Sequence, residues 1–267
     1  MSPSPYTTSN ALRKSAPDLE RQRLVLVSVG ALGISCVIMT QLALMRELLG
    51  AFSGNEMVLG VSLGLWLLLM GLGTRLGRNC GKLRNPLSAL AVIQVLVAVL
   101  PLVQVFLLRA LRNVVFTRGA AVGVAETVGA SFVLLLPYCL VAGYGLTLAS
   151  SILTQEEGPA GIGRAYIADG IGSVIGGILF CLVLVRFLDH IGILIYPALL
   201  NLVLAALLGF RAQGSKLARL GFPWLALGLI AAALVCAPDA LSTRLQYPRQ
   251  HIVARASLQC HECSPCG

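Results

Sequence analysis

The chain has 267 residues, of which 57% are hydrophobic and only 12% charged, and its mean hydropathy is +0.86. This balance excludes a soluble enzyme as the bulk of the chain, because so much apolar surface needs lipid to cover it. The formal net charge of +9 does not indicate nucleic-acid binding. The Lys and Arg residues lie mainly between apolar runs, where they anchor helix ends at lipid headgroups.

In chain order, a polar segment over residues 1–23 contains prolines and four bases, which predicts a disordered cytoplasmic tail. We predict an all-α helix bundle with a transmembrane domain over residues 24–237, followed by a C-terminal tail over 238–267. The first apolar run has no small-residue cleavage site, so we interpret it as a retained helix. The seven predicted spans are 24–45, 57–73, 87–108, 131–153, 166–185, 192–210 and 220–237.

The distribution of basic residues favours a cytoplasmic N-terminus in a multi-pass protein of the cell membrane. The segments on the membrane face that carries the N-terminus hold twelve Lys and Arg residues, against eight on the opposite face. Residues 119–153 form a long, mostly apolar stretch that has room for a re-entrant hairpin. The charge bias is the same with or without the hairpin, so the side of the C-terminus stays open.

The first group of polar residues lies at the end of the first span and the start of the second. It contains Gln41, Arg46, Glu47, Asn55 and Glu56. Arg46 and Glu47 are adjacent, so on a helix they would seek partners elsewhere in the bundle. Two carboxylates beside a vestibule would attract a cationic substrate, while the structural alternative is a set of ordinary ion pairs at headgroup level.

The fifth span carries the second polar feature. Asp169 lies about one turn inside it, where an ionised carboxylate needs a partner, water or a proton. It is the best single candidate for a functional membrane residue, and Tyr166 is a candidate beside it. Alternatively, Arg164, Tyr166 or a loop base could satisfy Asp169 as a structural lock. Small residues at four-residue spacing, Gly172, Ser173, Gly176 and Gly177, predict close helix packing and a central place in the bundle.

Two further motifs have simpler interpretations. The segment Arg75, Gly77 and Arg78 partly resembles the loop motif of major facilitator transporters, but Thr74 replaces its aspartate and no second half repeats it. A basic cytoplasmic loop explains it. Near the C-terminus, Cys260, Cys263 and Cys266 are weak metal-ligand candidates without a supporting shell. We expect no metal or cofactor, and the sequence contains no catalytic triad or phosphate-binding loop.

Five segments between residues 24 and 255 carry polar positions in a recognisable order. They are 40–47 (TQLALMRE), 54–57 (GNEM), 66–73 (WLLLMGLG), 136–144 (LPYCLVAGY) and 165–177 (AYIADGIGSVIGG). In this order they resemble the membrane region of the membrane-anchored spermidine synthase-like proteins. In that family a soluble α/β domain follows the helices and transfers an aminopropyl group from decarboxylated S-adenosylmethionine to putrescine. Residues 246–257 resemble the first strand of that domain, but the chain ends before a cofactor loop, so we expect a truncated or frame-shifted product without a catalytic site.

The resemblance implies the membrane domain of a polyamine aminopropyltransferase, with the bilayer and polyamines as partners. A small transporter or channel for a cationic solute is the alternative, with Asp169 and Glu126 along its path and Arg46 and Glu47 as a gate. A purely structural anchor that packs or oligomerises through the glycine-rich fifth span is the third hypothesis.

Overall fold

The computed structural model describes residues 16–51, 56–115, 124–187, 190–212 and 228. Within these ranges the chain is helical and contains no strand, which confirms the all-α class. The long helices are α1 (Ala16–Ser35), α3 (Glu56–Leu76), α4 (Pro86–Val115), α5 (Val124–Glu157), α6 (Ala160–Leu179) and α8 (His190–Arg211). Short elements extend them: the π-helices η1 (Cys36–Leu44) and η3 (Phe180–Leu184), the 3-10 helix η2 (Gly77–Lys82), α2 (Met45–Ala51) and α7 (Val185–Phe187).

Six helical segments are long and apolar enough to cross a bilayer, and they correspond to the first six predicted spans. The chain is a multi-pass membrane protein. Of the seventh predicted span, 220–237, the structure describes residue 228 alone. From Val124 to Glu157 the chain is a single helix, so the described part of this stretch forms no re-entrant hairpin. Pro137 lies inside α5 without ending it, as neighbouring helices in a membrane permit.

The first helix begins at Ala16, within the segment predicted as a disordered tail. Pro17 stands in the first helical turn, where its missing N–H costs nothing. Arg21 forms an ion pair with Glu156 at the end of α5, with 3.1 Å between Nε and Oε1. Arg211 at the end of α8 forms an ion pair with Glu20, with 2.7 Å between Nη2 and Oε2. These pairs place the start of α1 and the ends of α5 and α8 at one end of the bundle, here named the N-terminal end.

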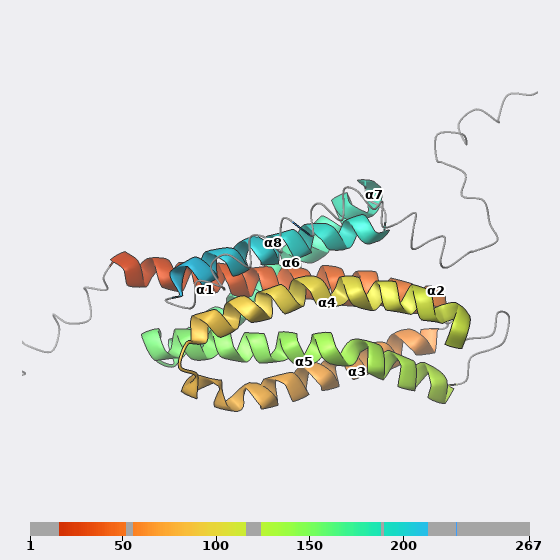
Figure 1. Ribbon diagram of the computed structural model, residues 1–267, viewed down its shortest axis with the longest axis horizontal. Helices are drawn as coiled ribbons and strands as arrows, with labels where there is room; N and C mark the ends of the chain where they lie inside the picture. The colour runs from red at the N-terminus through yellow and green to blue at the C-terminus, as the bar shows by residue number, and fades with distance from the viewer. Residues whose placement is uncertain (1–15, 52–55, 116–123, 188–189, 213–227, 229–267) are drawn as a thin grey trace, which may run out of the picture.

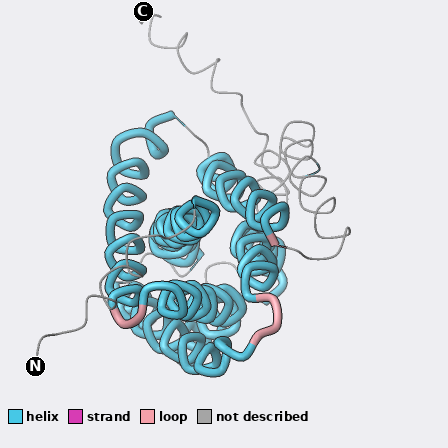
Figure 2. The backbone as a smooth tube through the Cα atoms, turned by 90° about the vertical axis from the view of Figure 1, so that its left-hand side faces the viewer, coloured by secondary structure: helices cyan, strands magenta, loops and turns pink. Residues whose placement is uncertain are grey.

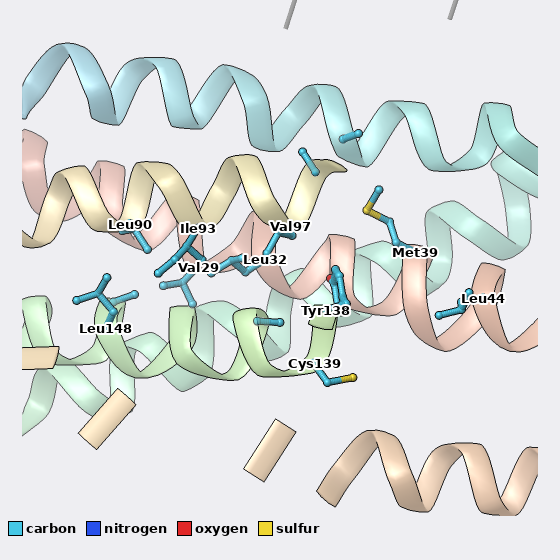
Figure 3. Close-up of a cluster of buried hydrophobic side chains, with 14 of the residues drawn as sticks. Val29, Leu32, Met39, Leu44, Leu90, Ile93, Val97, Tyr138, Cys139 and Leu148 are labelled. Carbon is cyan, nitrogen blue, oxygen red and sulfur yellow. The ribbon is translucent and has the colours of Figure 1, made fainter. Parts of the chain in front are cut away.

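The first helix is the hub of the bundle. It contacts α4, α5, α6 and α8, whereas α3 packs mainly on α5 and α4 mainly on α8. Figure 1 shows this order, with α1 and α4 between the pair α3 and α5 and the pair α6 and α8. Figure 2 shows the helices side by side, with short loops between them. The hydrophobic core surrounds α1, and in Figure 3 Val29 and Leu32 of α1 lie close to Ile93 and Val97 of α4.

Glycines create two seams where backbones nearly touch. In the first, Gly172 of α6 lies against the backbone of Gly30 in α1, and a methyl group on Gly176 would lie 3.0 Å from the Ile34 carbonyl oxygen. In the second, a methyl group on Gly73 of α3 would lie 2.6 Å from the Leu140 carbonyl oxygen of α5. Only glycine permits such approach, so these positions set the distances between the helices.

The glycine-rich helix α6 is not central, which corrects the prediction from its small residues. Only 22% of its most apolar window is buried, and Tyr166 is 58% exposed. Gly172 and Gly176 do pack on α1 as expected, but Gly177 has nothing within 4 Å. A helix that is apolar all round gives no signal of which side faces protein and which faces lipid. The small residues therefore predicted one close contact, and the central position did not follow from them.

Candidate functional site

A small cavity of about 70 Å³ lies inside the bundle between α1, α3, α5 and α6. Asp169 is nine residues from the start of α6, roughly 14 Å along its axis at 1.5 Å per residue, so the cavity lies well inside the membrane-spanning region. This volume has room for a few water molecules or a single small polar group. Its walls are formed by Leu32, Cys36, Val37, Gln41, Trp66, Met70, Ala142, Leu146, Asp169 and Ser173.

The Asp169 carboxylate has no ion-pair or hydrogen-bond partner among the described residues. The expected lock by Arg164 is not formed, because that guanidinium pairs with Glu157. Tyr166 does not serve either, since its side chain is mostly exposed on the outer side of α6. A carboxylate at this depth is costly without a proton, water or a cation. The cavity is the space from which such a partner would reach it.

Two hydrogen-bond donors near the cavity also lack acceptors among the described residues. They are the indole Nε1 of Trp66, which lines the cavity, and the hydroxyl of Tyr138. Tyr138 is fully buried between α5 and α1, within electrostatic reach of Cys36 and Asp169 (Figure 3). Unsatisfied buried donors are rare and indicate a water molecule or ligand at that place. The wall of the cavity therefore combines a carboxylate with an indole N–H, and neither has a protein partner among the described residues.

The local backbone explains how these groups meet. Gln41 reaches the same cavity as Asp169 because the first span continues as a π-helix from Cys36 to Leu44, and π-helical turns often occur at functional sites. Gly33 permits α6 to approach: a methyl group there would lie 3.1 Å from Asp169 Oδ1 and would also collide with its backbone oxygen. Sequence reasoning placed Gln41 with Arg46 and Glu47, and the structure separates it from them.

A buried ion pair lies toward the opposite end of the bundle. Arg109 of α4 donates to both carboxylate oxygens of Glu47, with 3.1 Å between Nε and Oε2, and the side chains are 5% and 11% exposed. Burial makes this pair dependent on both partners, since either charge alone would be poorly solvated. The sequence predicted that Glu47 would find a partner elsewhere in the bundle, but Arg109 could not be singled out because it is 62 residues away.

The other predicted path residues do not converge. Arg46 is exposed and lines only a minor pocket with Glu47. Glu126 lies in the first turn of α5 and does not line the cavity of Asp169. The side chain of Glu56 and the terminal cysteines Cys260, Cys263 and Cys266 lie outside the described residues. Ser173 belongs to the cavity wall, a role beyond the helix packing expected of it.

A third polar contact was missed by sequence reasoning. Asn201 of α8 donates to the Ser35 hydroxyl of α1 and, at 2.7 Å, to the Pro197 carbonyl oxygen, and its side chain is fully buried. Gln94 of α4 similarly donates to the Ser28 carbonyl oxygen at 3.0 Å. Such interhelical hydrogen bonds hold membrane helices together. The only available signal was the presence of amides inside apolar runs.

Comparisons with known proteins add no family assignment. No family model, curated protein or solved structure matches the chain.

Proposed function

We propose that the chain is the membrane domain of a spermidine synthase-like aminopropyltransferase system, and that its cavity binds an ammonium group of a polyamine. The observation that carries the proposal is Asp169, a carboxylate without a protein partner that lines an intramembrane cavity. An ammonium group would donate hydrogen bonds to the Asp169 carboxylate and to the side-chain oxygen of Gln41. The ordered similarity of polar positions supports the polyamine as the class of amine.

The orientation is part of this proposal. Among the described residues, eight Lys and Arg lie at the N-terminal end of the bundle and four at the opposite end. This bias favours an N-terminal end in the cytoplasm, where polyamines are substrates of such a system. The eight are Arg21, Arg23, Arg75, Arg78, Lys82, Arg84, Arg164 and Arg211.

The test measures protection of the Cys36 thiol, which lines the cavity. The full chain in lipid nanodiscs is labelled with N-ethylmaleimide, and mass spectrometry quantifies the modified Cys36 peptide with and without putrescine or spermidine. We expect either polyamine to slow labelling in the wild type. Asp169→Asn should weaken protection about tenfold or more, because a hydrogen bond to a charged group is lost.

Two controls keep the outcome specific. Glu126→Gln removes a carboxylate that does not line the cavity and should leave protection unchanged. The fully buried Cys139 should stay unlabelled in every variant that retains the fold. Polyamines that protect the wild type and Asp169→Asn equally, or protect neither, would overturn the proposal.

The transporter alternative is favoured by the depth of the same carboxylate, since ionisable residues inside spans mark ion and substrate pathways. Uptake of labelled spermidine into proteoliposomes by this chain alone separates the two functions. A binding domain shows protection of Cys36 without uptake. A carrier shows both, and Asp169→Asn abolishes uptake.

A further inference from the structure

The cavity is exposed on one side of the bundle at mid-span depth. Leu32 and Ala142 are buried, but the other eight residues in its wall keep partial exposure in the part of the chain that the structure describes. The helices on either side, α3 and α6, pack on α5 and α1 and make no comparable contact with each other. Each is only 22% buried over its most apolar window, the lowest fraction among the six spans. The exposed side of the cavity therefore faces lipid between α3 and α6.

The outer surfaces of these two helices are strongly apolar. On α3, Leu67 and Leu68 are 64% and 56% exposed, and on α6, Ile171 and Val174 are 56% and 63% exposed. An alkyl chain on a ligand would lie here in surroundings like the bilayer interior.

The volume of the cavity limits how much of such a ligand can lie inside it. A cavity of about 70 Å³ accommodates an ammonium group and a few carbon atoms, so the remainder of a longer amine must lie outside it. Inside the cavity, Asp169 and Gln41 complement a positive charge. Outside the cavity, the apolar surfaces of α3 and α6 complement a hydrocarbon chain. The two environments together match a molecule with one charged end and one apolar chain.

We infer that the cavity also accepts amines that carry an apolar chain and that reach Asp169 from the lipid phase, between α3 and α6. This inference rests on the assignment of Asp169 to an ammonium group in the proposed function, and it extends the class of amine beyond polyamines. The head group lies against the carboxylate, and the chain extends outward along both helices.

The experiment compares three probes on the full chain in nanodiscs: dodecylamine, butylamine and the neutral dodecanol, with the long-chain compounds dosed as mole fraction of lipid. Dodecylamine should protect Cys36 from N-ethylmaleimide, and Asp169→Asn should weaken this protection about tenfold or more. Dodecanol should protect neither protein, and butylamine should need a far higher concentration. Glu126→Gln again serves as the matched carboxylate control, with Cys139 as the internal measure of folding.

A photoreactive dodecylamine with a diazirine on its last carbon then locates the chain. Crosslinks that depend on Asp169 should appear on α3 and α6 peptides, and a neutral diazirine alcohol should give the same pattern in wild type and Asp169→Asn. Protection by putrescine but not by dodecylamine would overturn the lipid-phase inference and leave the proposed function standing. Protection by dodecylamine alone would overturn the polyamine assignment, and protection by neither would overturn both. Asp169-dependent crosslinks confined to the helix ends would also refute lateral access.

Discussion

Replacing Gly73 with alanine tests the seam that positions one wall of the cavity. The added methyl would lie 2.6 Å from the Leu140 carbonyl oxygen and 2.9 Å from that of Cys139, whereas ordinary contact begins at 3.4 Å. Helix α3 must therefore retreat from α5 by about 0.8 Å. A gap of this size loses roughly a quarter to a half of the attraction energy of each van der Waals contact between the two helices. Overpacking of this kind lowers the free energy of unfolding by about 1–3 kcal/mol.

The assay is unfolding by SDS in mixed micelles, followed by circular dichroism, from which the free energy of unfolding is obtained. The matched control is Gly71→Ala, two residues away on the same helix, because Gly71 is exposed with nothing within 4 Å. This variant loses no contact and should stabilise the protein by about 0.5–1 kcal/mol, because alanine is the better helix former. If Gly73→Ala and Gly71→Ala unfold at the same SDS fraction, the argument that backbone contact sets the α3 to α5 distance is refuted.

Three other side-chain changes give distinct expectations. Arg109→Leu should destabilise the protein by about 3–5 kcal/mol in the SDS titration, and the double variant with Glu47→Leu should recover much of this loss; additive losses would contradict a coupled pair. Tyr138→Phe should cost about 0.5–1.5 kcal/mol in the same titration, because a buried hydroxyl without an acceptor among the described residues indicates a bound water; unchanged stability would show that it binds none. Asn201→Ala should cost about 1–3 kcal/mol, measured in the same titration, because it leaves Ser35 without its donor; no change would remove that contact from the forces joining α8 to α1.

Length and hydropathy predicted the first six spans because these properties are local: each run must cross lipid by itself. The spacing of Gly172 and Gly176 likewise predicted a close contact that the structure confirms. The spacing could not identify the partner surface, nor place α6 at the edge, since lipid and protein neighbours select the same apolar residues.

The candidate site was predicted only in part. Asp169 was recognised because a carboxylate inside an apolar run is costly wherever it points. Its association with Gln41 and Trp66 depends on the π-helical stretch and on Gly33, which fix rotations that no local pattern encodes. The pairing of Glu47 with Arg109 required knowing that α4 lies beside the end of the first span.

The position of α1 as hub has a consequence for the order of synthesis. The glycines that α1 contributes to its seam with α6 are synthesised early. Gly172 of α6 emerges from the ribosome 139 residues after Gly33, which takes roughly 7–28 s at ordinary elongation rates. During this interval the nascent first helix holds Gln41 and Ser35 in the bilayer without α6 or α8. A variant that weakens the first span should therefore fail during insertion and reach the membrane in lower yield, even where the completed bundle would tolerate the change.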